Sequence, residues 1–117
     1  MSIQDEIEKG IGAHGLWKQR LIDAIETGKS DFTPETVSMD NQCVFGKWLY
    51  GCDHCKGSPY YEEVRELHAK FHEQAGAVLR HALAGQKTQA EELIAIGSEY
   101  RKISSALTLK LIDWKDS

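Results

Sequence analysis

The only two prolines of this 117-residue chain are Pro34 and Pro59, and both long segments on either side of them are free of proline. Proline disrupts a helix more than any other residue, because it lacks a backbone N–H and its ring clashes with the preceding turn. Residues 1–33 and 60–117 therefore contain no strong helix breaker, which favours long helices in both segments. A chain of this length can close one modest hydrophobic core, so we expect a single domain over residues 1–117.

Apolar residues in the proline-free segments recur every three or four positions, which is the spacing of one helix face. One helix is predicted from the start of the chain to Gly28, one from the Ser58-Pro59 pair to Leu83, and one from about Thr88. The inward faces contain Ile3, Ile7, Ile11, His14, Trp17, Leu21 and Ile25; Tyr61, Val64, His68, Phe71, Ala75, Val78 and Ala82; and Leu93, Ile96, Tyr100, Ile103, Leu107, Leu111 and Trp114. No segment alternates strictly between apolar and polar residues, so no strand is predicted.

The segment between the first two long helices is predicted to hold one short helix. Residues 28–40 are rich in turn-forming residues and indicate a loop. Asp40 is a suitable N-cap for a helix over 41–50, with Gly51 as its stop, so that Cys43 falls in its first turn. Residues 51–58 indicate a tight polar loop. The chain is therefore predicted to be all-α, an antiparallel four-helix bundle whose short second helix carries the cysteine.

Charge and composition narrow the function classes. The 14 Lys and Arg against 18 Asp and Glu give a net charge of −4, and no basic block favours nucleic acid as a partner. Apolar runs fall far short of the ~20 residues that cross a bilayer, and residues 1–20 lack a signal-peptide pattern. We expect a cytoplasmic protein without membrane contact. Three cysteines in such a protein argue against a disulfide framework and favour thiol or metal chemistry.

Three histidines and one cysteine are candidate metal ligands. His68 and His72 are one helical turn apart, and His14 lies on the inward face of another helix. Buried imidazoles are costly unless something satisfies their nitrogens. At a helix N-terminus, Cys43 would have its thiol pKa lowered by exposed amides. One thiolate and three neutral imidazoles suit tetrahedral zinc, Zn²⁺. The alternative is a set of hydrogen-bonded histidines and a cysteine packed as a small apolar residue.

The order and spacing of these residues resemble the bacterial chemoreceptor zinc-binding domain family. The matching segments are Ala13-His14 with Trp17-Lys18, then Cys43-Val44-Phe45-Gly46-Lys47-Trp48, then His68-Ala69-Lys70-Phe71-His72. The resemblance implies a four-helix bundle, zinc bound by His14, Cys43, His68 and His72, and a homodimer. It also implies a sensory role beside an effector of the chemoreceptor or diguanylate cyclase type, in chemotaxis or cyclic-di-GMP control.

Two further features of the middle segment carry predictions. Gly46 would let the short helix approach the helices that carry the histidines, and Trp48 would cover the site from solvent. Cys52-Asp53-His54-Cys55 departs from the family pattern. This C-x-x-C pair is interpreted as a surface loop without dedicated chemistry, with an accessory redox pair that exchanges with Cys43 and a second metal site as alternatives.

Three functions are compatible with the pattern. The first is a non-catalytic zinc sensor whose Cys43 thiolate responds to the zinc level or to an oxidant such as hypochlorous acid. The second is a zinc hydrolase with an open three-histidine site, although the sequence has no H-E-x-x-H motif. The third is a di-iron oxygen-binding bundle of the haemerythrin kind, for which Glu63 and Glu99 are the nearest carboxylates and complete no second ligand set.

Overall fold

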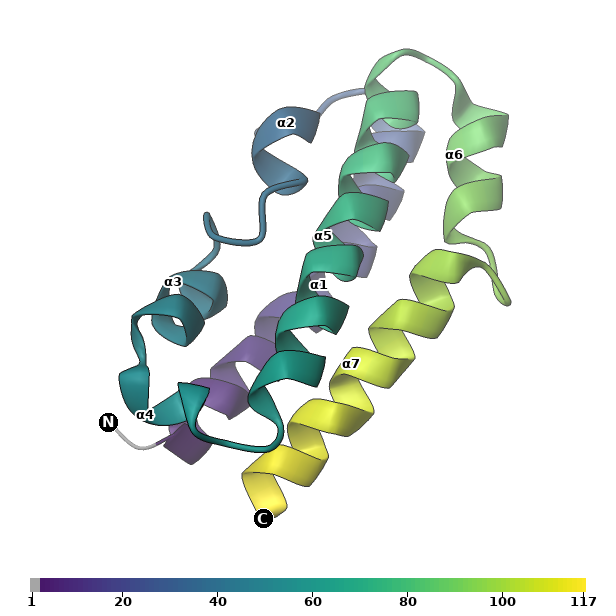
Figure 1. Ribbon diagram of the computed structural model, residues 1–117. Coiled ribbons are helices and arrows are strands. Elements are labelled where there is room, and N and C mark those ends of the chain that lie inside the picture. Colours follow the sequence, from purple (N-terminus) through teal and green to yellow (C-terminus); the bar gives the residue numbers. More distant parts are fainter. Residues whose placement is uncertain (1–2) are drawn as a thin grey trace.

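Three long helices, α1 (Ile3–Thr27), α5 (Tyr61–Leu83) and α7 (Glu99–Asp116), form the frame of the computed structural model, which describes residues 3–117. Between α1 and α5 lie the short helices α2 (Pro34–Val37), α3 (Val44–Gly51) and α4 (Asp53–Lys56), and α6 (Lys87–Ile94) precedes α7. The chain rises along α1, returns through α2 to α4, rises along α5 and returns along α6 and α7 (Figure 1). Within residues 3–117 there is no strand, so the predicted all-α, four-helix-bundle-like fold is confirmed.

The first and third legs of the bundle agree with the sequence prediction. α1 ends before Gly28, whose φ of +71° is the left-handed conformation that ends many helices. α5 ends at Leu83, shortly before Gly85 with a φ of +76°. α5 packs against α1, α6 and α7, and its buried face includes Val64, Phe71, Ala75, Val78 and Leu79.

The start of α5 differs from the prediction. Its N-cap residue is Tyr60, which makes no side-chain capping bond, and not Ser58. The Ser58 hydroxyl instead accepts a hydrogen bond from the Tyr60 N–H at 3.2 Å, which makes a local turn across Pro59. The predicted cap-and-proline signal therefore marks the turn that precedes the helix.

The second leg also begins differently from the prediction. The predicted loop over 28–40 contains α2, which Thr33 caps by accepting the Thr36 N–H at 3.2 Å. The short helix α3 has Cys43 as its N-cap, and not Asp40. The Asp40 carboxylate instead accepts a hydrogen bond from the Tyr50 hydroxyl. The site cysteine therefore lies at the residue before the helix and not inside its first turn.

The fourth leg is interrupted, which the regular apolar spacing did not predict. α6 ends at Ile94 and α7 begins at Glu99, with Gly97 at a φ of +87° and Ser98 as N-cap. Ile96, predicted to face inward, is 91% exposed. A left-handed glycine followed by a capping serine ends one helix and starts another, and this local signal outweighs the spacing of the apolar residues.

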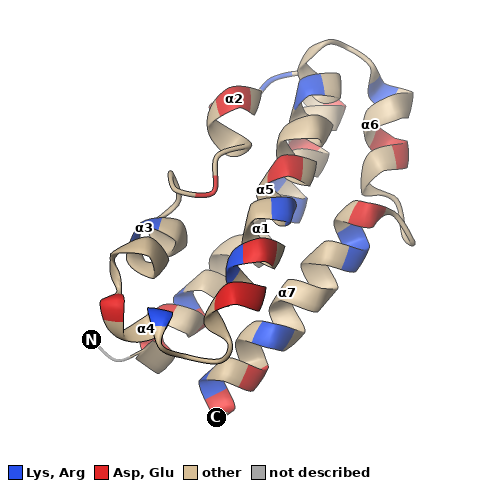
Figure 2. Ribbon diagram, in the orientation of Figure 1, with Lys and Arg blue, Asp and Glu red and all other residues tan. Residues whose placement is uncertain are grey.

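Charged residues cover the outside of the bundle. Lys and Arg alternate with Asp and Glu along α5 and α7 (Figure 2). Several of these pairs are a turn apart, such as Glu62 with Arg65 at 2.9 Å. Across residues 3–117, none of the helices combines the length and the apolar character that a membrane crossing requires.

Candidate metal centre

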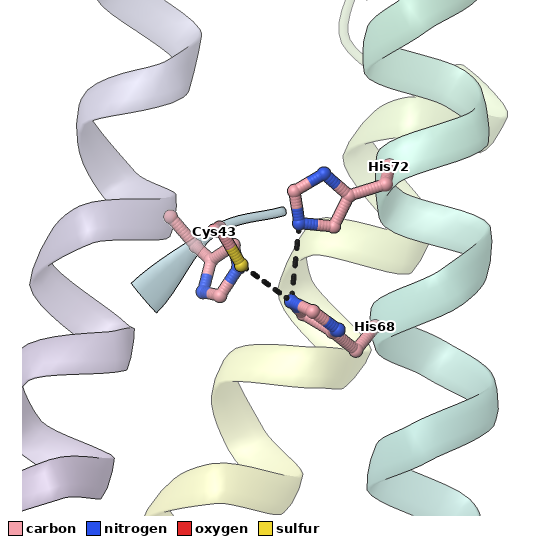
Figure 3. Close-up of side chains that lie close together, drawn as sticks. Cys43, His68 and His72 are labelled. Atoms are coloured by element: carbon pink, nitrogen blue, oxygen red, sulfur yellow. Dashed lines mark hydrogen bonds between the residues drawn. The ribbon is translucent and has the colours of Figure 1, made fainter. Parts of the chain in front are cut away.

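The four predicted ligands, His14, Cys43, His68 and His72, come together inside the bundle. One donor atom from each lies within 4.8 Å of the donors of the other three. His14 comes from α1, Cys43 from the N-cap of α3, and the other two from successive turns of α5 (Figure 3). The histidines are buried, and Cys43 is half-buried. The structure therefore unites the predicted set in one cluster.

Two of the donor separations are close to those around a tetrahedral metal ion. The His68 Nε2 lies 3.3 Å from the Cys43 Sγ and 3.1 Å from the His72 Nε2. Donors bound to tetrahedral zinc at ~2.0–2.3 Å are about 3.3–3.6 Å from one another. Sulfur and imidazole nitrogen are also the donor types that zinc prefers. The residues present therefore fit a zinc ion.

Two of the imidazole rings are held by backbone carbonyls. The His14 Nδ1 donates to the Gly10 carbonyl at 2.7 Å, and the His72 Nδ1 donates to the Val37 carbonyl at 2.9 Å. A proton on Nδ1 leaves the Nε2 lone pair free to bind a metal, and such bonds orient histidine ligands in metalloproteins. Both bonds lie outside what the sequence predicted. The bond to Gly10 follows from helix geometry, because Gly10 is four residues before His14. The bond to Val37 depends on where the segment between α1 and α3 runs, which the sequence does not give.

His68 is placed differently. Its buried Nδ1 has no hydrogen-bond partner in the part of the chain that the structure describes, so its polar contacts are made through Nε2. In Figure 3 this ring stands between Cys43 and His72, with a dashed line to each. Of the three histidines it is the most deeply buried, with no exposed surface. Within the described residues, this buried imidazole makes both of its polar contacts to other candidate ligands.

Burial keeps the histidines neutral. Desolvation, assisted by the neighbouring His72, lowers the pKa of His14 to about 4, and desolvation with both neighbouring imidazoles lowers that of His68 to about 2. Desolvation also lowers the pKa of His72, against the opposing effects of the Val37 carbonyl and Asp40. Neutral imidazole is the form that binds a metal. At pH 7 these side chains therefore require no deprotonation to act as ligands.

The cysteine behaves differently from the prediction. Desolvation raises the pKa of the Cys43 thiol, although the Gly46 N–H, which donates to the Sγ at 3.2 Å, acts in the opposite direction. The predicted lowering by helix amides is therefore wrong in sign for the metal-free protein, because burial outweighs it. A bound cation favours the thiolate of a coordinating cysteine, so thiolate formation at this site depends on the metal.

Close packing around two glycines sets the position of α3. A Cβ on Gly46 would lie 1.8 Å from the Asp40 carbonyl oxygen and 3.2 Å from the His68 Cε1. A Cβ on Gly10 would lie 2.4 Å from the Phe45 Cδ1. Gly46 thus lets α3 approach both the His68 ring, as predicted, and the turn before Cys43. The close approach at Gly10 was not predicted.

Phe45 covers the cluster, and not Trp48 as predicted. The ring centroid of Phe45 lies 5.6 Å from that of His14 and 5.1 Å from that of His68, both edge-on. The Trp48 ring packs on the Phe45 ring, with 5.6 Å between centroids, and on the Trp114 ring, with 6.0 Å between centroids. Phe45 and Trp48 are three residues apart and so share one face of α3. Phe45, which is nearer to Cys43, is the one that contacts the histidines.

A cavity of about 420 Å³ reaches the cluster from one side. His14, Cys43 and His72 form part of its wall, and most of the remaining wall is apolar, including Trp17 and Phe45. The cavity lies on the side of the half-buried sulfur, whereas His68 is not part of its wall. A small molecule can therefore approach Cys43 from this side.

The remaining candidate residues lie apart from this cluster. Glu63 is paired with Lys110 at 3.0 Å on the surface, and Glu99 is paired with Lys102 at 3.9 Å. Within residues 3–117 no second group of three or more metal-binding side chains was found. Cys52 and Cys55 form a disulfide. Two bonded sulfurs offer no thiolate to a metal, so the alternative of a second metal site at this pair has no support.

Comparison with known families agrees with the geometry of the cluster. A family model described as chemoreceptor zinc-binding domain matches residues 14–79, more than half of the chain, and the match spans His14, Cys43, His68 and His72. No curated protein and no solved structure matches the chain. The family match and the cluster agree on a zinc-binding domain with three histidines and one cysteine as its candidate site.

Proposed function

Because the chain belongs to the chemoreceptor zinc-binding domain family, we propose that it is a sensory domain that binds one zinc ion through His14, Cys43, His68 and His72. The observation that carries this proposal is the convergence of the four donor atoms within 4.8 Å. Two of the rings are already oriented by the Gly10 and Val37 carbonyls. Zinc bound there would connect α1, α3 and α5.

The donor set favours a sensory over a catalytic role. Structural zinc sites are closed by four protein ligands, whereas catalytic sites keep one position for water or substrate. Here three imidazoles and one sulfur supply four donors. A hydrolase would need Cys43 to stay unbound, although its Sγ lies 3.3 Å from the His68 Nε2. A di-iron centre would need further carboxylates, and Glu63 and Glu99 are engaged on the surface.

Cys43 is the residue through which an oxidant would act. Its thiolate can attack the chlorine of hypochlorous acid, which forms an S–Cl bond and breaks the Cl–O bond with loss of hydroxide. Water then replaces the chloride and gives a sulfenic acid, so that the sulfur loses two electrons and the oxidant gains them. A sulfenic acid lacks the negative charge that makes the thiolate a strong metal ligand. The cavity of about 420 Å³ beside the sulfur gives a small oxidant or chelator access. Zinc level and oxidant are thus two inputs to one site.

A sensory domain without catalytic activity acts through other proteins. We propose a homodimer in the cytoplasm that passes the state of the zinc site to an effector of the chemoreceptor or diguanylate cyclase type, in chemotaxis or cyclic-di-GMP control. Lys and Arg are interspersed with Asp and Glu along the helices in Figure 2, and the net charge of −4 disfavours nucleic acid as the partner. Analytical ultracentrifugation with and without zinc would measure the dimer.

Metal analysis of purified variants tests the assignment. The chain should hold about one zinc per molecule, and loss of any single ligand should weaken zinc binding by well over tenfold, because even an outer-shell partner is worth about 10–100-fold. His54→Ala is the matched control, because His54 is exposed on α4. An unchanged zinc content in the Cys43→Ala, His14→Ala double variant would refute the assignment.

X-ray absorption spectroscopy separates the sensor from the hydrolase. A zinc–sulfur distance near 2.3 Å is expected if Cys43 binds the metal, with zinc–nitrogen distances of about 2.0–2.1 Å. A spectrum without a sulfur contribution would instead support an open three-histidine site. Strong visible absorption after iron reconstitution, together with two irons per chain, would support the di-iron alternative.

A further inference from the structure

The helix that presents Cys43 has a second cysteine at its other end. Cys43 is the N-cap of α3, and Cys52 is both the C-cap of α3 and the N-cap of α4. Cys52 is bonded to Cys55, which lies on α4 and is 1% exposed. The α3 helix is therefore held at one end by the candidate zinc site and at the other by a disulfide that the zinc site does not use.

The two sulfurs of this disulfide differ in accessibility. Cys52 is half-buried, and its Sγ accepts the Cys55 N–H at 3.2 Å. Cys55 belongs to the hydrophobic core, where α4 packs on α5. In thiol–disulfide exchange an incoming thiolate attacks the sulfur that it can reach, and the other sulfur leaves. Cys52 is thus the attacked sulfur and Cys55 the leaving sulfur.

As a cross-link, this bond stabilises the fold less than one that closes a longer loop. It closes a sequence separation of only three residues. By the loop-entropy relation, so short a loop restricts the unfolded chain less than a longer loop does. The bond joins two adjacent elements, the end of α3 and the buried Cys55 of α4. Its effect is therefore local, on the attachment of α3.

Cys43 is not the exchange partner of this pair. The helix between Cys43 and Cys52 has eight residues, which corresponds to a length of about 12 Å. Direct exchange would require the sulfurs to meet, and therefore α3 to unfold. The predicted exchange of Cys43 with the pair is unsupported by this geometry. The partner must be a separate thiol that reaches Cys52 from solvent.

We propose that Cys52–Cys55 is a reversible thiol–disulfide exchange site for a dithiol reductant, and that its redox state sets how firmly α3 holds Cys43 in the zinc site. The second half rests on the proposed function. In the disulfide form, Cys52 is bonded to a sulfur embedded in the core, so the end of α3 is fixed to α4 and α5. Reduction removes this covalent attachment and leaves α3 held by its buried Phe45 and Leu49.

The reductant supplies both electrons and both protons of the exchange. One reductant thiolate bonds to the Cys52 sulfur, the Cys52–Cys55 bond breaks, and Cys55 leaves as a thiolate that takes up a proton. The second reductant thiol, as thiolate, then attacks the mixed disulfide and releases Cys52, which also takes up a proton. The protein gains two electrons and two protons, and the reductant leaves as a disulfide.

Thiol trapping of the whole zinc-loaded chain tests the exchange. The protein is equilibrated in mixtures of reduced and oxidised dithiothreitol or glutathione. Its free thiols are then alkylated, and the modified cysteines are identified by mass spectrometry. We expect the modifications at Cys52 and Cys55 to appear together and to reverse when the buffer is reoxidised. A pair that becomes reducible only after the protein unfolds, or one that never oxidises in the folded protein, would overturn the exchange site.

Zinc affinity in each redox state tests the coupling. A chromophoric chelator competes for zinc with the oxidised and the reduced chain. We expect reduction to weaken zinc binding by about fivefold or more, the lower end of usual coupling between sites. A Cys52→Ser variant cannot form the disulfide, so it should have the zinc affinity of the reduced chain in both buffers. Cys55→Ala, which removes the other sulfur, should give the same result. Equal affinities in the two states would overturn the coupling.

The two measurements also separate this proposal from the zinc assignment. Trapping of Cys52 and Cys55 does not depend on metal, so reversible exchange in a chain that binds no zinc would refute the sensor and leave the exchange site intact. A Cys43→Ala variant, in which the metal site is impaired, should show the same paired modification. Loss of exchange in that variant would overturn the assignment of Cys52 and Cys55 as an independent pair.

Discussion

Gly46→Ala is expected to disturb the zinc site although it adds one methyl group to a residue that is not a ligand. The new Cβ would lie 1.8 Å from the Asp40 carbonyl oxygen, where ordinary contact begins near 3.4 Å. The neighbour is backbone, which cannot rotate away. Either the turn at Asp40 or the first turn of α3 must therefore move by roughly 1.6 Å, and both adjoin Cys43.

The magnitude follows from two opposing effects. Overpacking a well-packed site typically costs about 1–3 kcal/mol, and a backbone clash of this size belongs at the upper end. Alanine is favoured over glycine within a helix by about 1 kcal/mol. The free energy of unfolding should thus fall by roughly 1–2 kcal/mol. Zinc affinity should fall as well, because the Gly46 N–H that donates to the Cys43 sulfur moves with the helix.

Gly51→Ala is the matched control. Gly51 is the last residue of the same helix, has no positive φ, and would place its Cβ in open space. This variant should be as stable as the parent or up to about 1 kcal/mol more stable, with unchanged zinc affinity. Urea denaturation of the zinc-free proteins and chelator competition measure both quantities. If the two variants behave alike, the close approach of Asp40 to α3 does not control the site.

Three further predictions concern pH, access and the helix break. Because the pKa of His14 is lowered to about 4 in the folded protein, the unfolded chain binds more protons below about 6.5, so this residue alone should cost the metal-free protein about 2 kcal/mol of unfolding free energy from pH 7 to 5. His14→Phe should remove this part of the pH dependence and leave the rest, because the pKa values of His68 and His72 are lowered as well; an unchanged pH dependence would contradict the lowered pKa of His14. Ala13 lies in the cavity wall, so Ala13→Phe should slow alkylation of Cys43 in the metal-free protein. Ala106→Phe, on an exposed face of α7, should leave the rate unchanged, and equal rates in the two variants would show that reagents do not reach Cys43 through the cavity. Gly97→Ala should destabilise the chain by about 1 kcal/mol because of its φ of +87°, measured by thermal denaturation; a gain in stability would contradict a rigid break.

The sequence predicts most of the long helices and the whole candidate ligand set. α1 and α5 were predictable because their apolar spacing and their terminating glycines agree. The break between α6 and α7 was not, because Ile96 continues the apolar spacing and yet is 91% exposed. At that point the Gly97-Ser98 pair, a stop followed by a cap, was the informative signal.

The details of the metal site depended on contacts that only the fold supplies. Asp40 and Cys43 are both possible N-caps, and the choice between them follows from the bond of Tyr50 to Asp40 and of the Gly46 N–H to the sulfur. The Val37 carbonyl reaches His72 across 35 positions of sequence. The direction of the Cys43 pKa shift depends on burial, which helix position alone does not give.

The four candidate ligands are held with unequal strength, and this inequality is what the proposed sensory role requires. The histidines lie on α1 and α5, two long helices that pack on each other through the core, so they keep their places without metal. Cys43 lies on the second leg, which is built of short helices and contacts the histidines through the Val37 carbonyl and the Phe45 ring. Loss of the single bond from Cys43 to zinc would remove one attachment of this leg, which buried Val37, Phe45 and Leu49 still hold to the core, and leave the other three ligands in place. A change at one sulfur would thereby act first on the start of α3, whereas loss of any histidine would leave the two long helices packed as before.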